Sequence, residues 1–179
     1  MLFEDALKWG EEGERLVARW FMSKGYVVAP LYQFDANTAP VLVSSKGKLV
    51  APDLSLFGHS KMFFAEIKRK NRWVRSKPHG LETGYDLRHH KHYLEVKQQT
   101  GCPVWILFLH ETTEPTGLFA AELGAQPVRR WDGLHHLTRE VISAKRMVFY
   151  KHENLIPLCS LEEIKSYDLG TDEHTNNVA

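Results

Sequence analysis

Residues 48–68 carry the clearest structural signal in this chain and read Lys-Leu-Val-Ala-Pro-Asp-Leu-Ser-Leu-Phe-Gly-His-Ser-Lys-Met-Phe-Phe-Ala-Glu-Ile-Lys. Apolar residues dominate both halves, and Gly58-His59-Ser60 lies between them. That pattern is typical of two strands joined by a tight turn. We therefore predict a β-hairpin made of strands 48–57 and 62–68.

The register of this hairpin decides which side chains meet. If Phe57 pairs with Met62, Asp53 lies opposite Glu66, and Ala51 lies opposite Lys68. Opposed residues share a face of the sheet with their Cβ atoms roughly 5 Å apart. Because side chains alternate along a strand, Glu66 and Lys68 point to one face together.

Opposed carboxylates on a sheet repel each other, which costs stability. A divalent cation between Asp53 and Glu66 would offset that cost. Carboxylate oxygens suit Mg²⁺, which keeps several of its waters, and Mn²⁺ can take its place. Lys68 would then orient an attacking water or neutralise charge that develops on a phosphate. The alternative is an exposed hairpin face on which Asp, Glu and Lys are ordinary salt-bridge partners.

Upstream of the hairpin, residues 3–24 predict a helix that ends at Gly25, with a possible break near Gly10 and Gly13. Glu14 lies on the same helical stripe as the apolar residue Val17. We therefore expect the Glu14 carboxylate at the edge of the core.

The rest of the chain predicts alternating strands and helices. Further strands are expected at residues 26–29, 41–43, 103–109, 117–122 and near 146–158, a loop at 71–84, a helix at 85–100, and a last short helix that opens at Ser160. The run 103–109 is nearly all apolar, as in a strand covered on both faces. This order predicts an α/β fold, a central mixed β-sheet flanked by helices.

Pro52-Asp53, followed after twelve residues by Glu66-Ile67-Lys68, resembles the signature of the PD-(D/E)XK nuclease superfamily. The helix segment around Glu14 resembles the first core helix of its resolvase-like members. The resemblance covers residues of about 10–110 and implies a restriction-endonuclease-like core. We expect a single nuclease-like domain at 1–168, with a core at about 10–122, a C-terminal extension at 123–168, and a flexible tail at 169–179.

Carried over by position, the resemblance implies roles for individual residues. Asp53 and Glu66 would bind the metal, and the backbone carbonyl of Ile67 would complete the site. Lys68 would be the catalytic lysine, and Glu14 would help to hold the metal or its water. The family implies Mg²⁺-dependent cleavage.

Basic residues follow the predicted catalytic strand. Residues 61–80 hold seven Lys and Arg against the single acid Glu66, although the whole chain has a formal net charge of only +1. A basic segment with an aromatic side chain is suited to bind backbone phosphates or to stack on an unpaired base. The candidate nucleic-acid contacts are Arg69, Lys70, Arg72, Trp73, Arg75, Lys77, and, on the predicted helix 85–100, Arg88 and Lys91. A solvated basic face is the alternative.

Composition limits the class of protein. The chain has 179 residues, of which 43% are hydrophobic, and contains only two cysteines, Cys102 and Cys159. No apolar run reaches the roughly 20 residues of a membrane span, and the first residues lack the pattern of a secretory signal. We therefore expect a soluble, cytoplasmic protein with no membrane contact.

Together these features predict a DNA endonuclease that recognises a DNA structure, works as a homodimer, or depends on a targeting protein partner. Three alternatives remain: a nucleic-acid-binding or assembly module with this fold and no cleavage, a nuclease that acts on RNA, and an unrelated α/β protein. In the last case Asp53 and Glu66 would not converge.

Overall fold

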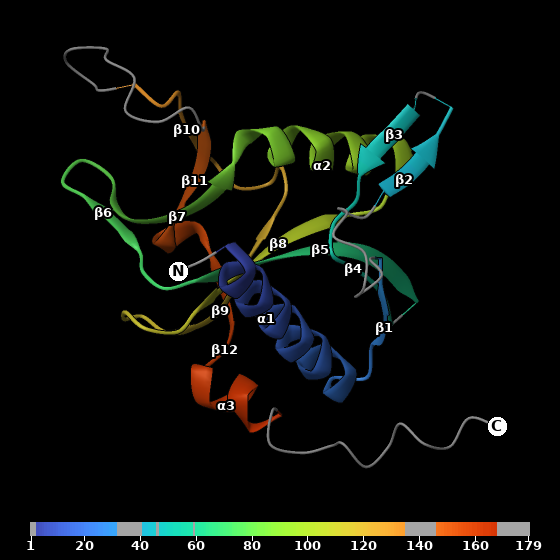
Figure 1. The fold of residues 1–179 in the computed structure, drawn as a ribbon, viewed down its shortest axis with the longest axis horizontal. Coiled ribbons are helices and arrows are strands. Elements are labelled where there is room, and N and C mark those ends of the chain that lie inside the picture. Colours follow the sequence, from blue (N-terminus) through green and yellow to red (C-terminus); the bar gives the residue numbers. More distant parts are fainter. Residues whose placement is uncertain (1–2, 32–40, 46, 59, 135–145, 168–179) are drawn as a thin grey trace.

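A computed structural model describes residues 3–31, 41–45, 47–58, 60–134 and 146–167, and Figure 1 shows their arrangement. The largest sheet, called the main sheet here, has the strand order β1-β4-β5-β8-β9-β12. Its strands are β1 (Val27–Pro30), β4 (Leu54–Gly58), β5 (Lys61–Lys70), β8 (Val104–His110), β9 (Gly117–Glu122) and β12 (Ile156–Cys159). β5 and β8 run parallel and the other neighbours antiparallel, so the sheet is mixed as predicted.

A second sheet with the order β10-β11-β7-β6 continues from the end of β5. It contains β6 (Val74–Ser76), β7 (Gly80–Asp86), β10 (Arg129–Trp131) and β11 (Met147–Lys151). A separate ribbon pairs β2 (Val41–Ser44) with β3 (Gly47–Val50). Residues after 122 thus complete both larger sheets, because β11 pairs with β7 and β12 pairs with β9.

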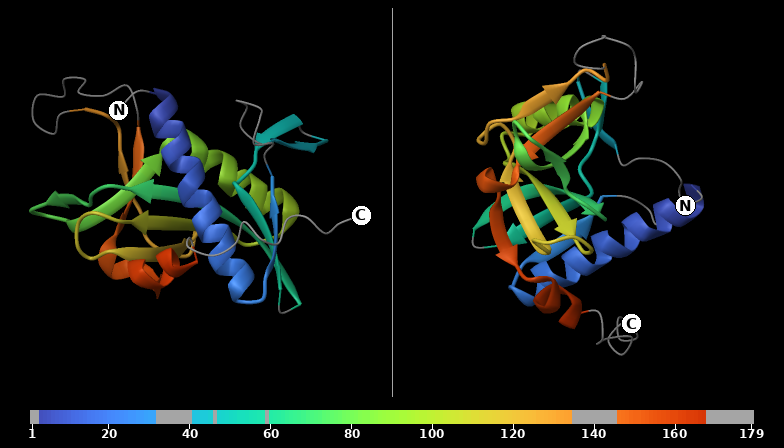
Figure 2. Two further views of the ribbon diagram at one scale, coloured as in Figure 1. Left: turned by 60° about the horizontal axis from the view of Figure 1, so that its bottom comes forward. Right: turned by 90° about the vertical axis from the view of Figure 1, so that its left-hand side faces the viewer.

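Helices cover both faces of the main sheet (Figure 2). α1 (Phe3–Ser23) and α3 (Leu161–Ser166) pack on one face, where Val17 and Ile164 meet Ile67 and Leu107 in a buried cluster. α2 (Leu87–Thr100) and the second sheet cover the opposite face. The remaining helical turn is η1 (His152–Asn154). The predicted α/β class is confirmed.

The predicted hairpin register is confirmed, but the first strand is interrupted. Leu54 pairs with Ala65 and Phe57 with Met62. The expected strand 48–57 is two strands, β3 and β4, with Ala51-Pro52-Asp53 between them. Proline has no N–H to donate to a ladder, so Pro52 ends the pairing. The prediction that Ala51 pairs with Lys68 is therefore wrong, and Asp53 lies one residue beyond the ladder.

Two helical predictions need correction. α1 runs without a break through Gly10 and Gly13. A Cβ atom on Gly13 would lie 2.8 Å from Cδ of Arg69, so that glycine makes room for a side chain from β5. α2 begins two residues later than expected because Tyr85 belongs to β7, and the Asp86 side chain caps the helix by accepting from the Arg88 N–H at 2.7 Å.

The segment 71–84, expected as a loop, forms β6 and the first part of β7. The strands expected at 103–109 and 117–122 are present as β8 and β9, while the region 146–158 divides into β11, η1 and β12. Ser160 caps α3, since its hydroxyl accepts from the Glu163 N–H at 3.1 Å. Gly101 ends α2 in a left-handed conformation with φ +70°. The predicted tail at 169–179 lies outside the described residues.

Candidate active site

Asp53 is fixed beside β5 by its backbone and by its side chain. Its carbonyl oxygen accepts from the Leu31 N–H at 3.0 Å, and its Oδ2 accepts from the Ile67 N–H at 2.7 Å. Because Ile67 lies between Glu66 and Lys68, this contact brings the Asp53 carboxylate to the segment that carries the other two predicted residues. Asp53 and Glu66 converge, as the sequence predicts.

Glu66 is a buried carboxylate with only half of its acceptors used. Its side chain is 2% exposed. Its Oε1 forms an ion pair with the Lys68 ammonium, whereas Oε2 is buried without a hydrogen-bond partner among the described residues. A buried anionic oxygen without a partner destabilises the fold. The site thus offers one unused carboxylate oxygen next to a lysine and a second carboxylate.

The charges of the site act on one another. Burial raises the pKa of the Asp53 carboxyl well above its usual range, and the carboxylates of Glu66 and Glu14 add to this effect. The Lys68 charge and the Ile67 N–H lower the Asp53 pKa, but they do not cancel the increase. Burial lowers the pKa of Lys68, but the nearby carboxylates of Glu66, Asp53 and Glu14 outweigh it, so that the pKa is raised overall. Lys68 is therefore an ammonium ion at neutral pH.

Glu14 reaches the site from α1. Its charge acts on both Asp53 and Lys68, although less strongly than that of Glu66. The adjacent Gly13 lets α1 approach β5 closely at this point. Glu14 therefore lies near enough to Asp53 and Lys68 for its charge to act on both.

The donor set suits a cation held by few protein ligands. Within the described ranges, no group of three or more His, Cys, Asp or Glu side chains is arranged to hold a metal ion. Mg²⁺ is typically held by one or two carboxylates together with waters and substrate phosphates. The unused Oε2 of Glu66 and the crowded carboxylate of Asp53 fit that pattern, and the site would be completed by water and substrate.

Two residues of α2 belong to the surroundings of the site, and the sequence analysis did not select them. Burial raises the pKa of the Tyr93 hydroxyl, and the charges of Glu66 and Asp53 raise it further, so the hydroxyl stays protonated beside the carboxylates. Burial and the Lys68 ammonium lower the pKa of His89. His89 and Tyr93 lie one helical turn apart, with ring centroids separated by 6.0 Å. Only the packing of α2 on the main sheet reveals their position.

The structure corrects two of the predicted nucleic-acid contacts. Trp73 is 6% exposed, and its ring stacks on His110 at 3.7 Å, so it is not accessible to a base. The Arg69 guanidinium donates to Glu111 and to the Trp9 carbonyl oxygen and lies over the Trp9 ring. Arg69 therefore joins α1 to the main sheet and is not available as a phosphate ligand.

The other predicted contacts remain accessible. Lys70 is half-buried, and burial together with the Lys68 charge lowers its pKa to about 8. The remaining five predicted contacts are exposed; they are Arg72, Arg75, Lys77, Arg88 and Lys91. A further exposed arginine, Arg130, lies on β10 of the second sheet, for which the sequence predicted no strand.

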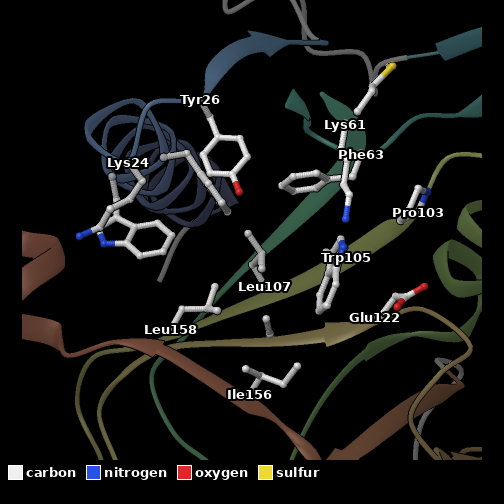
Figure 3. A pocket seen from close by; sticks show the side chains of 14 residues that line it. Lys24, Tyr26, Lys61, Phe63, Pro103, Trp105, Leu107, Glu122, Ile156 and Leu158 are labelled. Carbon is white, nitrogen blue, oxygen red and sulfur yellow. The ribbon is translucent and has the colours of Figure 1, made fainter. Parts of the chain in front are cut away.

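A wide apolar groove of about 670 Å³ lies elsewhere on the molecule (Figure 3). Tyr26, Phe63, Trp105 and Leu107 line it. Phe63 points to the face of β5 opposite to that of Glu66, because side chains alternate along the strand. The groove is therefore separate from the candidate active site.

The fold defined above is a mixed β-sheet flanked by helices, with a carboxylate and lysine site on its central hairpin. No protein-family model and no curated protein matches the sequence. Among solved structures, the chain is similar to Hjc, a Holliday junction resolvase from the archaeal hyperthermophile Archaeoglobus fulgidus. The sequence identity is 9% and the TM-score 0.47, over 80% of this chain and 89% of that chain.

No helix in the described part of the chain has both the length and the apolar character needed to cross a membrane.

Proposed function

We propose that this protein is a metal-dependent nuclease that hydrolyses phosphodiester bonds in DNA, in the manner of the PD-(D/E)XK enzymes. One observation carries the proposal: the Asp53 carboxylate binds the backbone of Ile67, between a buried Glu66 with an unused oxygen and the Lys68 ammonium. A buried carboxylate beside a second carboxylate and an ammonium is costly unless it has a ligand.

In this proposal Asp53 and Glu66 would hold Mg²⁺ or Mn²⁺, the Ile67 carbonyl oxygen would be a further ligand, and Glu14 would help to hold the metal or its water. The bound metal would acidify a water and polarise the phosphoryl oxygen.

Lys68 acts as a cation in this scheme. Because its pKa is raised, the ammonium cannot accept a proton from water at neutral pH. It can donate hydrogen bonds to a phosphate oxygen and stabilise the negative charge that develops there.

The test is cleavage of a panel of labelled DNAs, comprising supercoiled plasmid, linear duplex, single strand and four-way junction. Each is incubated with Mg²⁺, Mn²⁺ or EDTA, and a matched RNA strand tests the RNA-directed alternative. Asp53→Ala and Lys68→Ala are compared with Lys61→Ala, a lysine at the exposed start of the same strand. We expect metal-dependent cutting that falls by roughly 100-fold or more in the first two variants and is unchanged in the third.

DNA binding without cutting under any metal would instead favour a binding or assembly module. Cutting that survives in both Asp53→Ala and Lys68→Ala would place the active site elsewhere. Dimerisation and a targeting partner remain further proposals, tested by the mass of the free protein and of its DNA complex in solution.

A further inference from the structure

The second sheet contains a hollow beside the candidate active site, which we call the β7–β11 pocket. It has a volume of about 310 Å³. Its lining includes Phe149 and Trp131 from the second sheet and, from the segment at the end of β5, Lys70 and Arg72. The pocket thus combines aromatic side chains with two cations.

The floor of the β7–β11 pocket depends on a glycine. Phe149 pairs with Gly84 across β11 and β7. A Cβ atom on Gly84 would lie 2.8 Å from the Phe149 ring and 2.2 Å from the Val148 carbonyl oxygen. The bare backbone therefore lets the Phe149 ring lie close to β7 and leaves space above the strand. Trp131 pairs with Met147, two residues before Phe149, and places its half-buried indole in the same pocket.

The rim of the pocket attracts anions. Neither Lys70 nor Arg72 forms an ion pair with a carboxylate among the described residues. An ion pair on this sheet joins Arg129 to the buried Glu82, and the Arg129 guanidinium lies over the Phe149 ring at 4.5 Å from its centroid. Cations without partners beside aromatic rings form the combination that binds single-stranded nucleic acid, through phosphate contacts and base stacking.

The pocket is adjacent to the proposed catalytic centre. Lys70 follows Lys68 by two residues on β5 and points to the same face of the strand, roughly 7 Å further on. A strand whose phosphate lies at Lys68 therefore has its next nucleotide within reach of Lys70 and Arg72.

We propose that the β7–β11 pocket binds one unpaired nucleotide of DNA next to the phosphate that is cut. The half-buried Trp131 contacts the base, Phe149 forms the floor beneath it, and Lys70 and Arg72 contact the phosphate. This inference rests on the proposed nuclease function and defines its substrate class as DNA with unpaired nucleotides at the cleavage position. The volume is at the small end of the range for ligand pockets, roughly 300–1,000 Å³, and suits one nucleotide rather than a base pair.

The test measures binding in EDTA, where no cleavage is required. Fluorescence anisotropy compares a labelled 12-nucleotide single strand with its duplex, for the wild type and for Trp131→Leu, Trp131→Phe, Lys70→Gln and the control Trp105→Leu. Trp105 lines the apolar groove on the other side of the main sheet. One stacked base contributes roughly 1–3 kcal/mol, so Trp131→Leu should weaken single-strand binding by about 5- to 150-fold and Trp131→Phe by less.

Duplex affinity should change by less than about twofold in the Trp131 variants, and Trp105→Leu should match the wild type. Lys70→Gln should reduce the slope of log affinity against log salt by about 0.7 on single strands, as expected when one phosphate contact is lost. Equal losses on single strand and duplex, or no loss on either in both Trp131 variants, would overturn the inference.

The test separates this inference from the nuclease proposal. If the wild type cuts no DNA but single-strand binding still depends on Trp131, the pocket stands and the nuclease proposal fails. If the wild type cuts DNA and Trp131→Leu binds single strands normally, the nuclease proposal stands and the pocket fails.

Discussion

Asp53, Glu66 and Lys68 form a site that the folded chain holds at a cost in stability. The Glu66 carboxylate is withdrawn from water, Asp53 and Lys68 are half-buried beside it, and one oxygen of Glu66 has no hydrogen bond in the described structure. Burial and like charge raise the pKa of Asp53, which means that its charged form is disfavoured there. Residues of this kind trade stability for function.

Replacing Asp53 with asparagine should therefore stabilise the metal-free protein. The amide oxygen can still accept from the Ile67 N–H, while the repulsion from Glu66 and Glu14 disappears. We expect the melting temperature of Asp53→Asn in EDTA to exceed that of the wild type by a few degrees, equivalent to about 1 kcal/mol. Mg²⁺ should stabilise the wild type more than the variant, because only the wild type keeps both anionic ligands.

The matched control is Asp86→Asn, since asparagine caps a helix about as well as aspartate. That change should leave both the melting temperature and the response to Mg²⁺ nearly unchanged. A less stable Asp53→Asn protein in EDTA would show that the Asp53 charge supports the fold and is not in conflict with it.

The three central residues could be predicted from the sequence because local rules place them. Strand alternation puts Glu66 and Lys68 on one face, and the hairpin register brings Asp53 to them. Tyr93 could not be predicted, because its place beside Glu66 depends on how α2 packs against the main sheet. Trp73 was misjudged for the same reason, since its burial comes from the distant residues His110 and Phe119.

At the scale of elements, the contact between α1 and β5 positions Glu14. Arg69 extends from β5 past Gly13, donates to the Trp9 carbonyl oxygen at 2.6 Å, and binds Glu111 after β8. A helix glycine usually weakens a helix. Here the missing side chain allows the arginine to join the helix to the sheet.

The two glycines of α1 should respond oppositely to alanine. Gly13→Ala places a methyl group 2.8 Å from Cδ of Arg69, whose guanidinium is held at its far end, so we expect a loss of about 1–3 kcal/mol in unfolding free energy. Gly10→Ala meets nothing within 4 Å and should be neutral or stabilising by up to about 1 kcal/mol. Urea denaturation of both variants measures the difference, and equal effects would contradict this account of Gly13.

The sequence predicts most elements but not the interruptions between them. The apolar run 48–57 resembles one strand, and only the pairing of Leu31 with Asp53 and the effect of Pro52 show why it divides. β6 is a three-residue strand of Val, Arg and Ser, too short and polar to be distinguished from a loop. It exists because β7 pairs with it, and that is not a local property.

At the scale of the whole molecule, two buried histidines link folding to pH. Burial lowers the pKa of His110 to about 3 and of His90 to about 4. His110 lies between Trp73 and Thr83, its Nε2 3.1 Å from the Thr83 hydroxyl, and the His90 Nδ1 lies 2.8 Å from the Tyr85 hydroxyl. Both rings join the second sheet or α2 to the core in their neutral form.

The protein should therefore lose stability as the pH falls below about 6.5. A histidine whose pKa is lower in the folded state stabilises the fold above its unfolded pKa of roughly 6.5, and that contribution declines as the pH falls. Between pH 6 and 4.5 each histidine should lower the free energy of unfolding by up to about 1.4 kcal/mol for every unit by which the pH falls. Chemical denaturation at several pH values across this range measures the slope of the unfolding free energy against pH.

His110→Phe supplies the comparison, because phenylalanine can still stack on Trp73 but binds no proton. The slope of its unfolding free energy against pH should correspond to about one proton fewer taken up on unfolding, whatever its stability at pH 7. Identical slopes for variant and wild type would show that His110 does not titrate on unfolding.

The sequence predicts no functional role for the chain after residue 122. In the structure β11 and β12 complete the two larger sheets, and Trp131 and Phe149 line the β7–β11 pocket. Their pairing partners are distant along the chain, so local patterns could not reveal them. The predicted boundaries at 122 and 168 stay predictions.

The central claim is that Asp53 and Lys68 act together in one metal-dependent nuclease site. The most direct measurement is the rate of DNA cleavage in Mg²⁺ by the wild type, Asp53→Asn, Lys68→Ala and the double variant. Residues that work as one unit are strongly non-additive. We predict metal-dependent cleavage by the wild type and a double variant about as slow as the slower single variant. No cleavage by the folded wild type, or a double variant whose loss equals the product of the two single losses, would contradict the claim.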